Sequence, residues 1–105
     1  MDLKRQKDET FSIFNEIASK NDVPSTAVVD YQFVADGPNA AWDNAEKELI
    51  SLGFEVSRYE DEETLEVHSE PMEMTAKNVW ALEERLTLGL APHGFSPDGW
   101  GFFGT

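Results

Sequence analysis

Alternation of apolar with polar or β-branched positions is clearest in residues 26–35, which read TAVVDYQFVA. The odd positions are all apolar or aromatic, and this period of two is typical of a strand that buries one face. We expect Tyr31 and Phe33 on the buried face, in the middle of the core. The strand should end at residues 36–38, because Gly37 tolerates a positive φ and the following proline cannot donate a ladder hydrogen bond.

Helical periodicity flanks this strand on both sides and appears again near the C-terminus. Residues 2–20, 38–52 and 75–90 each carry apolar side chains at helical spacings, which form one stripe along a helix. Gly53 stands at the C′ position that commonly ends a helix, and Thr75 can cap the first turn of the third one. We therefore expect three amphipathic helices.

Two further alternating segments, 54–59 and 64–69, are joined by the charged tetrapeptide EDEE at 60–63. Two such runs with a polar turn between them predict an antiparallel hairpin. Near the C-terminus, the DG dipeptide at 98–99 is typical of a turn. Residues 100–103 are then long enough only for a short last strand.

The order of elements is a helix followed by two strand–helix–strand units. This order favours an α+β, ferredoxin-like (split β-α-β) fold, a four-stranded antiparallel sheet with two helices on one face, preceded by an extra N-terminal helix. The first and third strands would be central. We expect a single domain over residues 1–105, with the N-terminal helix in 1–22 and the βαββαβ core in 26–103, since a chain of this length supports one core.

Acidic residues dominate the composition: 21 Asp and Glu stand against 8 Lys and Arg, which gives a formal net charge of -13. Residues 59–76 contain seven carboxylates and neither Lys nor Arg. Such a field repels phosphate backbones and attracts basic partners, so we expect no direct binding of nucleic acid. The excess of acid can equally serve solubility alone.

The chain contains no cysteine, which excludes disulfides and thiolate metal sites. Its first residues lack the apolar stretch of a leader, and no apolar run approaches the length that spans a membrane. We therefore expect a cytoplasmic protein that does not bind membranes, present as a monomer or a weak dimer.

No pattern in the sequence indicates an enzyme. A cysteine nucleophile, a glycine-rich phosphate loop after a strand and a serine in a nucleophile elbow are all missing. The two histidines, His68 and His93, stand at no recognised metal-ligand spacing from other donors. We therefore expect no metal site, no cofactor and no catalytic residues. An alternative role for His68 is a pH-sensitive position in an interface.

Several segments together resemble one known family. They are ADGPNAA at the end of the first strand, LISLGFEV at the join between the second helix and the second strand, and the closing HGFSPDGWGFF. Over nearly its whole length the sequence resembles the regulator of ribonuclease E activity B (RraB) family. The resemblance implies a small acidic protein of split βαβ fold that binds the C-terminal scaffold region of the endoribonuclease, rather than its RNA, and lowers its activity on some transcripts. It brings no catalytic residues.

The candidate partner-binding residues are strand positions that face away from the helices, together with the hairpin tip: Asp30, Gln32, Glu55, Glu60, Asp61, Glu62, Glu63, Glu66 and His68. Carboxylates at these positions would accept guanidinium bonds from a basic region of the ribonuclease. A second group is expected to shape the backbone and the sheet edge: Gly37, Gly53, Asp98, Gly99, Trp100 and Gly101. For Trp100 two interpretations stand, a plug between the sheet edge and the third helix or an exposed interface anchor.

Two other functions share parts of this pattern. A ferredoxin-like module that binds a small regulatory ligand would need a pocket between helices and sheet. An inhibitor of an unrelated basic nuclease or toxin would use the same electrostatics on a different target.

Overall fold

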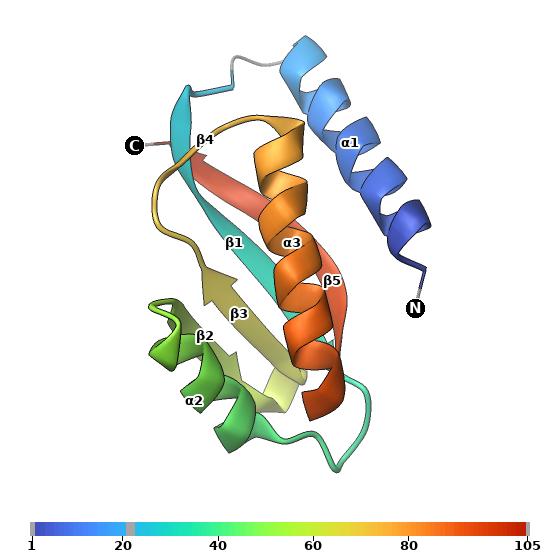
Figure 1. The fold of residues 1–105 in the computed structure, drawn as a ribbon, viewed down its shortest axis with the longest axis vertical. Coiled ribbons are helices and arrows are strands. Elements are labelled where there is room, and N and C mark those ends of the chain that lie inside the picture. The colour runs from blue at the N-terminus through green and yellow to red at the C-terminus, as the bar shows by residue number, and fades with distance from the viewer. Residues whose placement is uncertain (1, 21–22, 105) are drawn as a thin grey trace.

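The computed structural model describes residues 2–20 and 23–104, so the predicted ranges 1–22 and 1–105 also include residues outside this part. It confirms an α+β fold with an antiparallel sheet and an N-terminal helix (Figure 1). The elements are, in chain order, α1 (Leu3–Lys20), β1 (Thr26–Ala35), α2 (Trp42–Ser51), β2 (Glu55–Tyr59), the 3₁₀-helix η1 (Glu60–Glu62), β3 (Thr64–His68), β4 (Met72–Glu73), α3 (Ala76–Leu90), the 3₁₀-helix η2 (Ala91–His93) and β5 (Phe95–Gly104).

Strand β1 is the centre of the sheet. It pairs antiparallel with β3 along one edge and with β5 along the other, and β2 pairs with the outer edge of β3. The expected first and third strands are therefore the central ones. The sequence pattern does not predict the short strand β4, which pairs with the start of β1 on the same edge as β3. The edge is known because Ala27 is paired with Met72 of β4 and, on its other side, with Gly104 of β5.

The sheet face that carries Tyr31 and Phe33 forms the core, as expected. Both side chains are buried, together with Leu65 and Val67 of β3. Helix α3 covers this face, because the Tyr31 hydroxyl donates a hydrogen bond of 2.8 Å to the carbonyl of Val79. The central strand is thus bound to the helix layer by packing and by one buried polar contact.

The three helices lie on this same face of the sheet (Figure 1). Trp100 of β5 is paired with Tyr31, so the two side chains share a face, and the Trp100 ring stacks on Phe14 of α1 with centroids 6.5 Å apart. Further along the sheet, the guanidinium of Arg58 in β2 lies over the ring of Trp42 in α2, 5.3 Å from its centroid. The opposite face is therefore covered by no helix of the described residues.

Helix α2 begins at Trp42, four residues after the predicted start at 38. The backbone before it bonds elsewhere: the amide of Asp36 donates to the carbonyl of Gly94, and that of Ala41 to the carbonyl of His93, both at 2.8 Å. These bonds hold the segment against the end of η2 and outside the helix.

The predicted end of α2 is confirmed. Gly53 has a φ of 93°, and its amide donates to the carbonyl of Ile50 while the amide of Phe54 donates to that of Leu49. This pair of bonds is a Schellman motif, which needs a left-handed residue at C′. The start of α3 is confirmed as well, since the Thr75 hydroxyl accepts a bond from the amide of Asn78 at 3.0 Å.

The last strand is much longer than predicted, and the prediction of a turn at Asp98-Gly99 is wrong. Pro97 pairs with Phe33 and Gly99 pairs with Gln32, so Asp98 is the extra residue of a β-bulge within one continuous strand. A proline is tolerated there because β5 is an edge strand. The DG dipeptide therefore bends the strand without ending it.

No helix in the described part of the chain has the length and hydropathy needed to cross a membrane.

Candidate functional site

Cross-strand pairing gathers the predicted sheet residues on the helix-free face. Paired residues in neighbouring strands share a face, so the register builds two parallel rows of side chains. The first row is Glu55, His68, Asp30 and Gly101, and the second is Ser57, Glu66, Gln32 and Gly99. We call the six side chains of these rows, without the two glycines, the acidic face.

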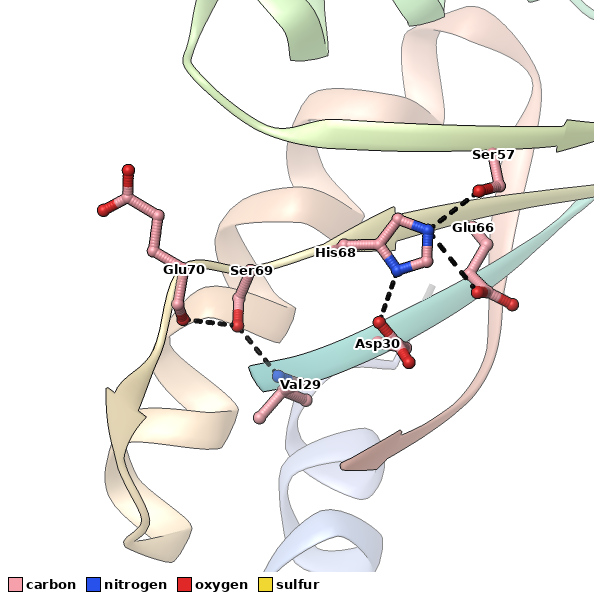
Figure 2. A network of polar contacts seen from close by, with 7 residues as sticks. All are labelled: Val29, Asp30, Ser57, Glu66, His68, Ser69 and Glu70. Atoms are coloured by element: carbon pink, nitrogen blue, oxygen red, sulfur yellow. Dashed lines mark hydrogen bonds and ion pairs between the residues drawn. The ribbon is translucent and has the colours of Figure 1, made fainter. Parts of the chain in front are cut away.

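His68 is the centre of this face (Figure 2). Its Nδ1 contacts Oδ1 of Asp30, and its Nε2 lies 2.9 Å from the hydroxyl of Ser57 and 3.5 Å from Oε1 of Glu66. The side chains of His68 and Asp30 are only 22% and 9% exposed. An ionised Asp30 can only accept a hydrogen bond, so in that state Nδ1 of His68 is the donor. Asp30 is therefore a buried support of the histidine, whereas the prediction placed it as an exposed contact residue.

Ser69 makes a separate set of bonds at the end of β3. Its hydroxyl accepts a bond of 2.9 Å from the amide of Val29 and donates one of 2.7 Å to the carbonyl of Glu70 (Figure 2). The bonds bridge the gap between β3 and β4, where Pro71 interrupts the ladder. The bond to Val29 also attaches the end of β3 to β1, next to the pair of Asp30 and His68.

Three possible metal ligands converge on this face. Asp30, Glu66 and His68 each offer a donor atom, and these atoms lie within 4.8 Å of one another. Chain spacing does not reveal the group, because β1 and β3 bring it together through pairing. The second histidine lies elsewhere, with its Nε2 2.7 Å from Oε2 of Glu48. The expected absence of a metal site rests on chain spacing alone, and it stays a prediction.

The hairpin tip, residues 60–63, is exposed along its whole length. Glu60 is paired with Arg58 at 3.1 Å, and the same guanidinium bonds Asp43 of α2 at 2.7 Å. The hydrogen bond from Arg58, together with its charge, lowers the pKa of the Asp43 carboxyl. Among the described residues, Asp61, Glu62 and Glu63 make no side-chain ion pair, so three charges at the tip remain available to a partner.

The expected backbone residues fall in different places. Gly53 ends α2, whereas Gly37 is exposed and does not adopt a left-handed φ. Gly99 and Gly101 border the two rows of the acidic face, and a Cβ at either position would meet nothing within 4 Å. Trp100 is half-buried and contacts Phe14 of α1 rather than serving only the third helix.

A second feature escaped the sequence analysis, the buried carboxylate of Glu83 in α3. It accepts bonds from the Thr10 hydroxyl at 2.5 Å and from the Gln6 amide at 2.8 Å, and so joins α1 to α3. Burial raises the pKa of Glu83, an effect that the two hydrogen bonds partly offset. The helical spacing from Val79 through Glu83 to Leu86 was the available signal, since it places an acid on the buried stripe.

An open groove of about 500 Å³ runs between α1 and β5 beside this carboxylate. Its walls include Ile13 of α1 and Trp100 of β5, and Glu83 lies between them. No sequence pattern identifies this groove, because it arises from the way α1 docks on α3.

Comparison with curated proteins gives no match. The family model described as "Regulator of ribonuclease activity B" matches residues 7–102, which include all of the acidic face and the hairpin tip. The match spans nearly the whole chain and agrees with the segments that carry the resemblance. The chain therefore belongs to the RraB family, a family of regulators of ribonuclease activity.

Proposed function

We propose that the protein is a non-catalytic regulator that binds a basic region of a ribonuclease through the acidic face and the hairpin tip. The observation that carries this proposal is the segregation of charge on the sheet. Asp30, Glu55 and Glu66 share the helix-free face, while Arg58, the one Lys or Arg in the five strands, is on the helix side. A positively charged peptide would meet no competing cation of the strands on this face.

Binding of this kind would deny the basic region to RNA or to other partners. Single exposed ion pairs contribute only about 0–1 kcal/mol, so the effect has to be collective. The net charge of -13 adds long-range attraction, which speeds encounter with a basic partner. The cytoplasmic location and the absence of direct binding to nucleic acid belong to the same proposal.

The structure gives less support to a small-ligand module, because the space of about 500 Å³ between α1 and β5 is an open groove and not an enclosed pocket. The apolar cavity between α2 and α3, lined by Leu49, Phe54 and Leu86, holds only about 30 Å³. This volume is close to that of one water molecule.

The test is binding of the full chain to the purified ribonuclease and to overlapping peptides from its basic regions, by calorimetry. Affinity should fall as salt rises from roughly 50 to 300 mM, because exposed charges are screened. The double variant Glu55→Gln, Glu66→Gln should weaken binding by about 2- to 30-fold, from about 0.2–1 kcal/mol per charge.

The matched control is Glu16→Gln, Glu84→Gln, which makes the same change of charge on α1 and α3. It should change affinity by less than about 2-fold, because surface charges away from the contact act only at long range. Equal losses in the two variants would show that net charge alone matters, and would contradict a contact on the acidic face.

A further inference from the structure

Strand β5 leaves one edge of the sheet open. It pairs with β1 over nine of its residues, and no strand of the described residues pairs with its outer edge. An unpaired edge presents a row of amide and carbonyl groups that can add another strand. Pro97 and the bulge at Asp98 disturb the first half of this edge, whereas the register from Gly99 to Gly104 is continuous. The second half is therefore the part suited to pairing.

Residues 96–100 of β5 line the groove between α1 and β5, so the groove meets the continuous part of the edge at Gly99 and Trp100. Figure 1 shows α1 and β5 as the two elements on either side of it. The groove offers apolar contact, since Ile13 is 48% exposed on its helical wall and Trp100 is half-buried on its strand wall. A groove between a helix and an edge strand is the geometry in which extended peptides bind by strand addition. Main-chain bonds would then supply affinity, and alternate side chains would supply specificity.

Charge decides what kind of segment fits. Four carboxylates line the groove, from Asp2, Glu9, Glu83 and Asp98, against the single guanidinium of Arg5. That guanidinium is already paired with Glu9 at 3.2 Å. A second copy of this chain would bring another net charge of -13 to the same edge, and like charges disfavour that pairing. A basic segment is complementary.

We propose that an extended basic segment adds to the free edge of β5 as a sixth strand. Where the added strand passes Gly99 and Trp100, side chains on one of its faces would enter the groove, with apolar ones against Ile13 and Trp100 and basic ones toward the carboxylates. The intervening side chains would lie on the acidic face, over the open space beside Gly99 and Gly101. The groove and the acidic face would thus contact the two faces of the added strand. The identification of the partner as a ribonuclease rests on the proposed function, whereas the mode of binding does not.

The test combines amide exchange with a matched pair of variants. Two probes are used, the overlapping peptides from the ribonuclease and a synthetic peptide of alternating Arg and Val. In the complex, alternate amides of residues 99–103 should gain protection from exchange by NMR. Ile13→Lys should weaken binding by about 10-fold or more, since it removes an apolar contact and adds a like charge in the groove. Ile50→Lys, at a position 57% exposed on α2, should change it by less than about 2-fold.

The outcomes separate the two proposals. Protection along β5 together with sensitivity to Ile13→Lys supports strand addition. Ribonuclease peptides that bind without protecting β5, and equally well to the Ile13→Lys variant, would overturn it and leave the ribonuclease contact standing. If no ribonuclease peptide binds, the proposed function is overturned. The Arg/Val peptide then decides on strand addition: protection of the β5 amides from exchange supports it, and no protection overturns it. Protection that appears with rising protein concentration alone would assign the edge to a second copy and also overturn the proposal.

Discussion

Replacing Thr10 by valine should loosen the joint between α1 and α3, and its effect should depend on pH. Thr10 is 3% exposed and Glu83 is 6% exposed, and the hydroxyl donates a bond of 2.5 Å to the carboxylate. Valine has nearly the same shape as threonine but lacks the hydroxyl, so the substitution removes a donor from a buried charge. Gln6 remains as the other donor, at 2.8 Å.

The expected cost follows from the charge of the acceptor. Hydrogen bonds to charged groups contribute about 1.5–3 kcal/mol, so Thr10→Val should lower the free energy of unfolding by that amount at pH 8. Burial raises the pKa of Glu83 above its ordinary value of 4.5, which means that the folded state holds the proton more tightly than the unfolded chain. The stabilisation from this proton is present at low pH and is lost as the pH rises through the raised pKa.

The bond from Thr10 favours the ionised carboxylate, and its loss must raise the pKa of Glu83 further. The cost of Thr10→Val should therefore shrink as the pH falls from 8 to 5, because a larger share of the carboxyl is protonated and a bond to the neutral group is worth only about 0.5–1.5 kcal/mol. Both pH values lie above the sequence pI of about 4.3, where solubility is lowest.

Urea unfolding followed by tryptophan fluorescence measures this cost at each pH. The control is Thr64→Val, because that hydroxyl bonds only the exposed carbonyl of Glu62. The control should change the free energy of unfolding by less than about 0.5 kcal/mol at every pH. A cost for Thr10→Val that is the same at pH 8 and pH 5, or below about 0.5 kcal/mol at pH 8, would refute the assignment of Glu83 as a buried charge held by Thr10.

Two further substitutions test local features of the fold by the same unfolding measurement. Gly53→Ala should lower the free energy of unfolding by about 1–2 kcal/mol, because a Cβ there meets no neighbour within 4 Å and only the left-handed backbone opposes it. The control is Gly37→Ala, at a position without a left-handed φ, which should change the free energy of unfolding by less than about 0.5 kcal/mol. Equal costs for the two variants would exclude the backbone explanation. Tyr31→Phe should cost about 1 kcal/mol through loss of the bond to the Val79 carbonyl, and an unchanged midpoint would mean that this carbonyl needs no donor from the sheet.

The sequence predicted those elements whose pattern is local. The alternation in residues 26–35 gave the central strand with the same bounds as β1, and the cap at Thr75 gave the start of α3. In these segments the burial pattern and the local backbone preferences agree. Where long-range bonds compete with local preference, the prediction failed. The amide of Ala41 bonds η2 rather than a helical turn, and Asp98 joins a strand because β1 offers a complete ladder beside it.

For the candidate site, the sequence predicted which side of each strand a residue faces, but not how deeply it is buried. Asp30 and Glu66 are on the predicted face, yet Asp30 is buried because His68 and its neighbours in the rows cover it. The joint at Glu83 and the groove beside it depend on where α1 docks. Helical periodicity alone does not fix that docking, since it identifies an apolar stripe but not its partner.

The register of the sheet explains how one face can carry several carboxylates without placing any two of them directly opposite each other on neighbouring strands. Each carboxylate in the two rows is paired across the strands with a group that is not acidic: Asp30 with His68, Glu66 with Gln32 and Ser57, and Glu55 with His68. Like charges placed directly opposite would destabilise the pair. A slip of two residues between β1 and β3 would keep every side chain on its own face, so the hydrophobic pattern alone does not exclude it. That slip would set Asp30 against Glu66 and would break the contact between Asp30 and His68. The polar network therefore favours the observed register over this slip, because it keeps Asp30 on His68 and does not place it directly opposite Glu66.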